Sequence, residues 1–376
     1  MKLTPYSLLF TPLLFISLSG TAQSGFTNKA EAKNEKSDGR KTGKWIEYMD
    51  TAYGTPDDST RPFYMLTEYK NDEPQGMVRE YYKHGAIKME IPYVNGKKDG
   101  VQKEYYENGN VMSEYPYSKD EKNGTVKKYY SNGKLKIEWP YTNGKINGTQ
   151  ISYYESGAVD WKVPYVNSLS EGTGIEYYES GAKKWEQPYT KDQKNGILKE
   201  YYESGAKKWE QPYTMDQKNG TLKEYYEDGK LKSETIYVNG VKSGVWKEYF
   251  KSGKLQYEWP YSNGKLNGTA KEYSETGKLT YERQYTNDQK NGEVKEYGES
   301  GKVLNEWPYT NGQKNGDMKG YYASGNLEWV VPYANDKKNG MQKHYFESGK
   351  MESETPFTNG TEGVTRHFAE NGEEIK

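Results

Sequence analysis

The sequence predicts an all-β repeat protein in which tandem 24-residue β-hairpins stack into an elongated, single-layer twisted sheet. A glycine recurs every 24 residues from Gly76 to Gly340, and a second glycine follows each one nine residues later. With the first glycine of a unit counted as position 0, tyrosine occupies position 5 in all twelve units and position 17 in eleven of them. Fixed periods of roughly 20–50 residues are typical of solenoids and stacked arrays.

Each unit is expected to form one hairpin. Residues 101–106 and 110–117 have the composition of two strands, and the three residues between them end in Gly109. Such a loop suits a type I turn closed by a left-handed residue. A second loop, such as 142–148, carries two Asn-Gly pairs and leads to the next hairpin. Proline recurs at position 16, as at Pro116, and because it cannot donate to a ladder we expect strand pairing to finish there.

If this turn sets the register, two residues that face each other across the hairpin have position numbers that add up to sixteen. On one side of the sheet, glutamate at position 4 then faces lysine at position 12. On the other side Tyr201 faces Lys207, and Lys199 faces Trp209 in a cation–π pair. One face is therefore expected to carry charges and the other aromatic rings. The expected charge pairs are Glu80–Lys88, Glu176–Lys184, Glu200–Lys208 and Glu224–Lys232.

The first 22 residues have the features of a secretion signal. A basic start is followed by an apolar stretch and by the small residues Gly20 and Ala22, so we expect cleavage after Ala22. The alternative is an uncleaved anchor, but the stretch is shorter than the roughly 20 residues that span a bilayer. We expect an exported protein, periplasmic, cell-surface or secreted, with no membrane span after cleavage.

The rest of the chain divides into four segments, according to how closely each one follows the repeat. Residues 23–40 are polar and are expected to form a disordered linker, and 41–75 a divergent N-terminal capping hairpin. Residues 76–362 hold the twelve repeats, and 363–376 a partial C-terminal capping repeat.

Composition excludes several classes of function. With 53 basic and 54 acidic side chains the net charge is −1, which gives no electrostatic reason to expect nucleic acid or an anionic membrane as partner. Hydrophobic residues make up only 32%, but an aromatic content of 15% argues against disorder. Without cysteine there are no disulfides.

No motif predicts catalysis, a metal or a cofactor. The three histidines, His84, His344 and His367, share no ligand spacing, so we expect them on the surface. The glutamates recur at the same positions of most repeats with lysine beside them, whereas a catalytic pair of carboxylates would occur at one place in the chain only. Each loop aspartate stands alone, and calcium takes about six to eight oxygens. We therefore expect a protein that is not an enzyme.

The tryptophans vary between units and give the best candidate for a binding face. Under the register above, positions 13 and 15 share a face with the position-5 tyrosines, so exposed rings would line a groove able to stack sugars or grip a peptide. The alternative is that tryptophan only packs against the neighbouring hairpin. The candidate residues are Trp139, Trp161, Trp185, Trp209, Trp259, Trp307, Trp329, Tyr201 and Tyr225.

The pattern Gly-x-x-Lys-Glu-Tyr-Tyr-Glu-Ser/Asn-Gly-Lys-Leu-Lys-x-Glu-x-x-Tyr-x-Asn-Gly-x-x-Asn-Gly resembles the variant MORN repeat. That repeat is found in bacterial proteins named as the antitoxin component of a toxin–antitoxin module. The resemblance covers 76–372 and weakly 41–75. It implies stacked β-hairpins and a non-catalytic interaction role.

These observations together predict an extracytoplasmic scaffold that binds another protein along its aromatic face. Two other functions remain open. One is a glycan- or cell-wall-binding module, and the other is an antitoxin- or immunity-type protein that neutralises a toxin.

Overall fold

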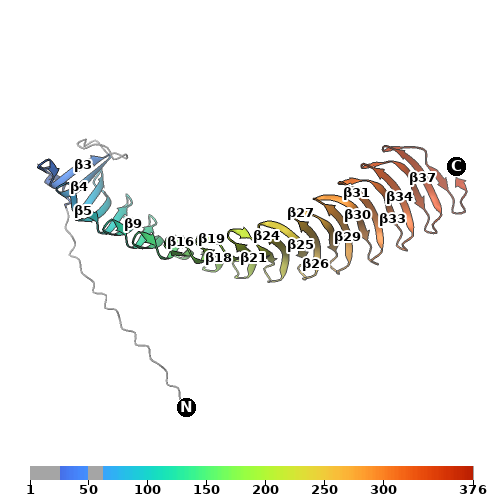
Figure 1. The fold of residues 1–376 in the computed structure, drawn as a ribbon, viewed down its shortest axis with the longest axis horizontal. Helices are drawn as coiled ribbons and strands as arrows, with labels where there is room; N and C mark the ends of the chain where they lie inside the picture. Colours follow the sequence, from blue (N-terminus) through green and yellow to red (C-terminus); the bar gives the residue numbers. More distant parts are fainter. Residues whose placement is uncertain (1–25, 50–61, 376) are drawn as a thin grey trace, which may run out of the picture. The chain divides into compact units, whose positions relative to one another are not determined.

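A computed structural model describes residues 26–49 and 62–375. The expected signal peptide, 1–22, lies outside the described residues. The chain divides into two compact units, 1–145 and 146–376, and each is described by itself. Strands dominate both units (Figure 1). The segment η1 (Lys29–Glu31) is a single 3₁₀ turn. Across the described ranges, no helix is long and apolar enough to cross a membrane.

The strands of the first unit are β1 (Lys36–Ser37), β2 (Arg40–Lys41), β3 (Gly43–Met49), β4 (Phe63–Lys70), β5 (Glu73–Tyr82), β6 (Ile87–Val94), β7 (Lys97–Lys98), β8 (Gly100–Tyr105), β9 (Val111–Ser118), β10 (Glu121–Lys122), β11 (Gly124–Tyr129) and β12 (Leu135–Thr142), with β13 (Lys145–Ile146) at the boundary.

Those of the second unit are β14 (Gly148–Tyr153), β15 (Val159–Val166), β16 (Leu169–Ser170), β17 (Gly172–Tyr177), β18 (Lys183–Thr190), β19 (Gln193–Lys194), β20 (Gly196–Tyr201), β21 (Lys207–Thr214), β22 (Gln217–Lys218), β23 (Gly220–Tyr225), β24 (Leu231–Val238), β25 (Val241–Tyr249), β26 (Leu255–Ser262), β27 (Lys265–Leu266), β28 (Gly268–Tyr273), β29 (Leu279–Thr286), β30 (Gln289–Tyr297), β31 (Val303–Thr310), β32 (Gln313–Lys314), β33 (Gly316–Tyr321), β34 (Leu327–Ala334), β35 (Lys337–Lys338), β36 (Gly340–Tyr345), β37 (Met351–Thr358), β38 (Thr361–Glu362), β39 (Arg366–Phe368) and β40 (Glu374–Ile375).

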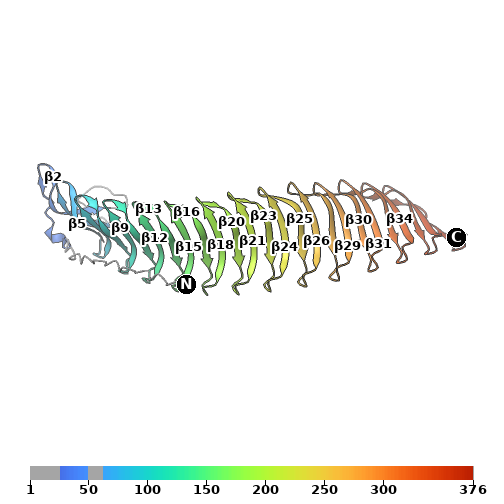
Figure 2. The same ribbon diagram turned by 60° about the horizontal axis from the view of Figure 1, so that its bottom comes forward.

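The predicted fold class is confirmed. Within each unit every hairpin pairs antiparallel with the next, and the result is an open layer of strands that does not close into a barrel. Figure 2 shows the strands of the second unit side by side in chain order.

The hairpin of residues 196–214 shows how one repeat is built. Its strands β20 and β21 are joined by a tight turn, in which the Gly205 N–H donates to the Tyr202 carbonyl at 2.9 Å. The Tyr202 N–H donates to the Ala206 carbonyl at 2.8 Å. Gly205 has φ +86°, the left-handed conformation that closes a three-residue turn. The turn prediction is confirmed.

A β-bulge shifts the register away from the predicted one. Tyr201 pairs with Lys207, as predicted, but Glu200 then pairs with Trp209, so that Lys208 is the extra residue. Positions 0 to 4, which lie further from the turn than position 5, pair with partners whose position numbers bring the sum to seventeen. The predicted register of these positions is therefore wrong by one residue. The same shift occurs in all twelve repeats, which lie within the described residues.

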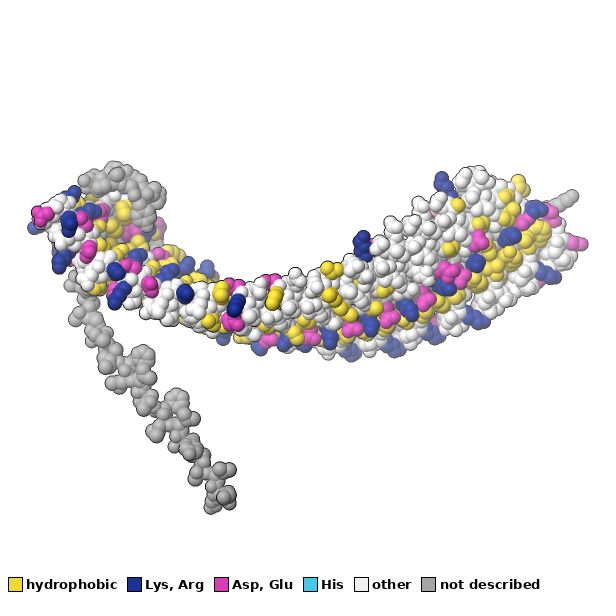
Figure 3. All heavy atoms as spheres, in the orientation of Figure 1, with side chains coloured by type: hydrophobic (Ala, Val, Ile, Leu, Met, Phe, Trp, Pro, Cys, Tyr) yellow, Lys and Arg dark blue, Asp and Glu magenta, His cyan; other side chains and the backbone are white. Residues whose placement is uncertain are grey.

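The bulge redistributes side chains between the two faces of the sheet, because opposed residues share a face and successive residues alternate. The tryptophan face carries positions 2, 4, 12, 13, 15 and 17, here Leu198, Glu200, Lys208, Trp209, Gln211 and Tyr213. The tyrosine face carries positions 1, 3, 5, 11, 14 and 16, here Ile197, Lys199, Tyr201, Lys207, Glu210 and Pro212. The predicted separation into a charged and an aromatic face is therefore wrong, since both faces carry both kinds of side chain. Figure 3 shows charged and hydrophobic side chains in parallel rows along the second unit.

Within the repeats, the core follows the middle of the tryptophan face. Many of its least exposed side chains stand at positions 2 and 15, among them Val126 (2% exposed), Val163 (4%), Gln187 (1%) and Ala270 (1%). A single layer cannot enclose a core, so this narrow strip is covered by side chains of the same face. Stability must then come from many contacts between neighbouring repeats.

Strand pairing does not finish at the proline. β21 continues through Pro212 to Thr214, and Tyr213 still pairs with Lys218. The ladder to the next repeat, however, consists only of the pairs Trp209–Glu224 and Glu210–Lys223, and it ends before the proline. Proline is tolerated because no ladder bond to the next repeat is required at its nitrogen.

The proline also explains the glycine at position 0 of the next repeat. Gly196 has φ +123°, and a Cβ there would lie 3.0 Å from Cβ and Cγ of Pro188. The proline ring thus occupies the space that glycine leaves open, and the two residues form a matched pair across the repeat junction.

Three side-chain hydrogen bonds reinforce the junction between repeats. The Tyr201 hydroxyl donates to Glu186 at 3.0 Å, and the Tyr178 hydroxyl donates to the Tyr201 carbonyl at 2.8 Å. In the loops, the Lys194 N–H donates to the Asp216 carboxylate at 2.8 Å. The first of these recurs as Tyr105–Glu90, Tyr129–Glu114, Tyr225–Glu210, Tyr249–Glu234, Tyr273–Glu258, Tyr297–Glu282 and Tyr321–Glu306.

Residues 26–40 are not the disordered linker that was expected. The Asn34 side chain bonds both the N–H and the carbonyl of Ile46 on β3, at 2.9 and 3.1 Å. The Trp45 indole donates to the Glu35 carbonyl at 3.1 Å, and Phe26 is only 5% exposed. The polar composition concealed this role, which is to cover the outer edge of β3.

Removal of one whole repeat should leave the array folded. Deletion of residues 205–228 removes one period, so the flanking hairpins meet with the same junction geometry. Deletion of 205–216 removes half a period and brings unlike positions together. Circular dichroism and urea denaturation should show a cooperative transition for the first variant and none for the second. Equal loss in both would contradict the repeat model.

Alkali should weaken the junctions at a defined pH. Burial, together with the bond to Glu186, raises the pKa of Tyr201 from 10.0 to about 12, and burial with the Glu210 bond does the same for Tyr225. A raised folded-state pKa means that this stabilisation is complete below the unfolded pKa and is lost as the pH rises through the folded one. The urea midpoint should therefore fall between pH 10 and about 12.

The variant Tyr201→Phe isolates one junction. It should lower the free energy of unfolding by about 1.5 kcal/mol at neutral pH, the usual contribution of a hydrogen bond to a charged group. Its loss of stability in alkali should be smaller than that of the wild type. A urea midpoint that stays constant between pH 10 and about 12 in both proteins would contradict the role given to the Tyr201–Glu186 bond.

Candidate binding face

The seven candidate tryptophans all lie on the tryptophan face, at positions 13 and 15, and all are half-buried. Tyr201 and Tyr225 do not join them. Their hydroxyls bond Glu186 and Glu210 on the tyrosine face, because the bulge separates position 5 from position 13. The predicted grouping of these two tyrosines with the tryptophans is wrong.

Three tryptophans form a row across the strands of the second unit. Trp161 pairs with Glu176, which pairs with Trp185, which in turn pairs with Glu200 and so with Trp209. Indole and carboxylate alternate along this row. Successive tryptophans stand two strands apart, or about 9.6 Å at the usual strand spacing. The row is called the tryptophan ladder below.

The carboxylates between the rings hold the indoles in place. Trp185 Nε1 donates to Glu176 and Trp209 Nε1 donates to Glu200. Each carboxylate also accepts from the bulged lysine, Lys184 Nζ at 2.7 Å from Glu176 and Lys208 at 2.9 Å from Glu200. The bond to Glu200 raises the pKa of Lys208 above its usual value. The ring planes are therefore fixed before any ligand arrives.

Most of the predicted lysine–glutamate pairs are present despite the different register. Besides the two above, Lys88 Nζ lies 2.5 Å from Glu80. The pairs survive because position 12, as the bulged residue, stays on the same face as position 4. Glu224 instead accepts a bond from the Ser233 hydroxyl.

The predicted cation–π pair of Lys199 with Trp209 is wrong. Lys199 lies opposite Glu210 on the tyrosine face, and its Nζ is 3.6 Å from Glu186. Other lysines do stack on rings. Lys194, from the short strand β19, lies over the Tyr213 ring at 5.5 Å on the tryptophan face.

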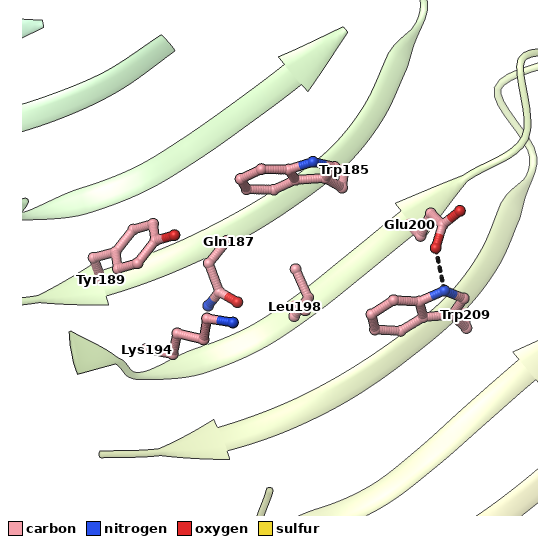
Figure 4. Close-up of a pocket in the computed structure, with 7 residues that line it drawn as sticks. All are labelled: Trp185, Gln187, Tyr189, Lys194, Leu198, Glu200 and Trp209. Atoms are coloured by element: carbon pink, nitrogen blue, oxygen red, sulfur yellow. Dashed lines mark hydrogen bonds between the residues drawn. The ribbon is translucent and has the colours of Figure 1, made fainter. Parts of the chain in front are cut away.

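A pocket of about 210 Å³ opens between two rungs of the ladder (Figure 4). It exists because the ladder from β18 to β20 has only two residue pairs, after which the short strand β19 intervenes. Trp185 and Trp209 stand at its two sides, with Leu198 between them. The lining residues are Trp185, Gln187, Tyr189, Lys194, Leu198, Glu200 and Trp209.

Gln187 is the unusual residue of this pocket. Its side chain is 1% exposed, and its Nε2 donates to the carbonyl of the adjacent Pro188 at 2.8 Å. Its Oε1 is buried and has no hydrogen-bond partner among the described residues. Gln211, one repeat further on, has the same arrangement, with its Oε1 equally unpartnered in the described part of the chain. A buried acceptor without a donor costs stability, typically about 1–3 kcal/mol.

The same positions line a second pocket of about 250 Å³ near the end of the array. There the Trp329 indole lies over Gly320, so close that a Cβ on Gly320 would be 2.1 Å from its Nε1. Gln342, at position 2, accepts a bond from Lys338 Nζ at 2.8 Å. The second pocket therefore has a tryptophan wall, but its glutamine acceptor is already satisfied.

The arrangement is suited to recognition. The repeats of Trp185 and Trp209 offer flat ring surfaces, a buried acceptor and a nearby ammonium group, from Lys194 and Lys218. Within residues 26–49 and 62–375, no group of three or more His, Asp or Glu side chains is placed to hold a metal ion. The charged groups nearest the rings bond to one another, as Glu200 and Lys208 do.

The fold and this face define a class of protein, an open array of β-hairpins that presents the same positions of successive repeats along one face. Eight segments match the family model described as "MORN repeat variant", so these segments are similar to MORN-type repeats. The matched segments are 74–95, 98–119, 122–143, 218–239, 242–263, 266–287, 290–311 and 338–359.

The seven candidate tryptophans fall into two groups, one inside the matched segments and one between them. Trp139, Trp259 and Trp307, at position 15, lie inside matched segments. The tryptophans of position 13 all lie in the stretches between matches, 144–217 and 312–337. The repeats of those stretches keep the same register and bulge. The ladder and the pocket between Trp185 and Trp209 both lie within the stretch 144–217.

Among curated proteins none matches this sequence. Two similar solved structures are titled "Crystal Structure of TcdB2-TccC3-Cdc42" and "Crystal Structure of TcdB2-TccC3". The first is 11% identical with a TM-score of 0.17 and covers 80% of this chain and 19% of that chain. The second is 10% identical with a TM-score of 0.18 and covers 88% of this chain. The chain thus spans about a fifth of the length of each, 19% and 20%.

Replacing Gln187 by leucine should stabilise the protein. Gln187→Leu removes a buried acceptor that has no donor, so the free energy of unfolding should rise by about 1 kcal/mol. Gln102→Leu is the matched control, because the buried Gln102 accepts from Lys98 Nζ at 3.0 Å and should lose stability when replaced. Urea denaturation measures both. Equal destabilisation would mean that the Gln187 acceptor is satisfied.

Proposed function

We propose that the chain is a non-catalytic interaction scaffold that acts outside the cytoplasm and binds another protein along its tryptophan face. The observation that carries the proposal is the tryptophan ladder, in which half-buried indoles recur at one position of successive repeats. Tryptophan is among the residues that contribute most to protein interfaces, and rings already held in place lose little entropy on binding. MORN-type repeats are consistent with such a scaffold.

A non-catalytic role agrees with the way charges are used. The glutamates and lysines of the ladder recur from repeat to repeat and bond to one another, as Glu176 does with Lys184. The basic start and the apolar stretch of residues 1–22 support the proposed location outside the cytoplasm.

A glycan is the second candidate ligand, because sugar rings also stack on flat indoles such as those beside the pocket. An antitoxin-type role, which the resemblance implies, would be a special case of protein binding.

Capture of a partner should depend on the tryptophan face. The full chain would be immobilised and exposed to envelope extract, both untreated and freed of glycans. We expect one polypeptide to be captured in both extracts, and capture to be lost with Trp185→Ala/Trp209→Ala. The matched control is Ile197→Ala/Val245→Ala, which truncates apolar residues 44% and 36% exposed on the tyrosine face.

Three results would contradict this proposal. Capture that fails only with the control variant would place the interface on the tyrosine face. Retention of the chain on purified polysaccharide or peptidoglycan, together with loss of capture in the extract freed of glycans, would favour the glycan-binding module. Capture unaffected by either variant would exclude both faces at this part of the array.

A further inference from the structure

We infer that the tryptophan ladder binds a proline-rich segment in the polyproline II conformation, with one turn of the ligand for each repeat. The inference rests on the proposed function and names the ligand of its site. The site runs from Trp161 to Trp209 across β15–β21, and it includes the pocket of Gln187.

The spacing of the rings selects the conformation of the ligand. Neighbouring tryptophans are about 9.6 Å apart, two strand spacings. A polyproline II helix has three residues per turn and rises about 3.1 Å per residue, so one side of it repeats every 9.3 Å or so. An extended β-strand repeats its side chains about every 6.7 Å, so its successive same-side residues cannot meet neighbouring indoles one after another. A proline at every third residue would therefore meet every indole in turn.

The hydrogen-bonding groups of the pocket fit the same ligand. A polyproline II segment makes no internal hydrogen bonds, so its N–H and carbonyl groups need partners when a protein covers them. The buried Oε1 atoms of Gln187 and Gln211 have no donor among the described residues, and they recur with the period of the ladder. Each can accept one backbone N–H of a residue between the prolines once the side chains that cover it move aside on binding.

Lysines supply the complementary donor. Lys194 lines the pocket, and Lys218 occupies the equivalent position one repeat later. Both ammonium groups lie over tyrosine rings, 5.5 Å from Tyr213 and 5.0 Å from Tyr237. They can donate to ligand carbonyls without leaving their rings. The repeats of Trp185 and Trp209 thus each present one ring, one acceptor and one donor, while the repeat of Trp161 contributes its ring. Aromatic-lined grooves are a known way to bind proline-rich segments.

The site is local. Position 13 carries tryptophan in three successive repeats here, but Ser233 in the repeat that follows. Position 15 carries the buried glutamine only in two repeats of the same stretch, at Gln187 and Gln211. The stretch 144–217, which the family model does not match, contains all of these residues. The departures from the repeat pattern thus occur together, and one ligand accounts for them.

The direct test is binding of a degenerate peptide library to the full chain. The peptides have about twelve residues, roughly four turns, with proline at every third position and random residues between. A control library of equal proline content places the prolines at irregular spacing. Tryptophan fluorescence and calorimetry measure binding. We expect the regular library to be enriched and its best peptides to bind about tenfold more tightly than control peptides.

Variants of the full chain then locate the site. Trp185→Ala should weaken binding of the selected peptides about tenfold, and Gln187→Leu about fivefold, while urea denaturation confirms that both remain folded. Trp329→Ala, at the same position outside the ladder, should leave binding unchanged. So should Ile197→Ala on the tyrosine face. Trp185→Phe should retain most of the affinity, because it keeps a flat ring.

The outcomes separate this inference from the proposed function. No enrichment of the regular library, or enrichment that Trp185→Ala does not affect, would overturn the inference. If a polypeptide is still captured through the tryptophan face, the proposed function stands and only the ligand is wrong. Binding of xylan, cellulose or chitin oligosaccharides that depends on Trp185 would overturn both and assign the site to glycans.

Discussion

The hydrogen bond from the position-5 tyrosine to the position-14 glutamate of the preceding repeat is the contact on which the array depends most. A single layer has no enclosed core, so each hairpin is stabilised by its two neighbours. The backbone ladder between repeats has only two residue pairs, as between β18 and β20. Tyr201 and Glu186 lie next to that short ladder and lengthen it with a side-chain bond. Where Lys162 replaces the glutamate, it lies over the Tyr177 ring at 5.6 Å and so still contacts the next repeat. Val330, which replaces the glutamate before Tyr345, has no carboxylate to accept such a bond.

The sequence predicts the period, the turn and the fold class, because these follow from glycine and tyrosine spacing. It does not predict the bulge at Lys208, since a bulged residue carries no compositional mark in a run such as Lys207–Gln211. One extra residue changes the face of every side chain beyond it. That is why Tyr201 and Trp209, expected on the same face, lie on opposite faces. The same shift accounts for the incorrect cation–π pair.

The candidate site was predicted in part. The tryptophans were found because they break the repeat pattern, and the structure places all seven on one face. Gln187 was missed, because an isolated glutamine in a polar sequence does not indicate burial. A signal was present: position 15 carries Ile91, Val163 and Val331 in other repeats, which marks it as an interior position. A glutamine there is a buried polar group that needs a partner.

Hydrogen exchange in the Tyr201→Phe variant tests most directly whether repeats stabilise only their neighbours. Amide protection would be measured peptide by peptide by mass spectrometry in wild type and variant. Protection should fall in the hairpins 172–190 and 196–214, which this bond joins, and should remain at the wild-type level in repeats beyond residue 268. A uniform loss of protection along the whole second unit would contradict the account, because it would show that the repeats share their stability globally.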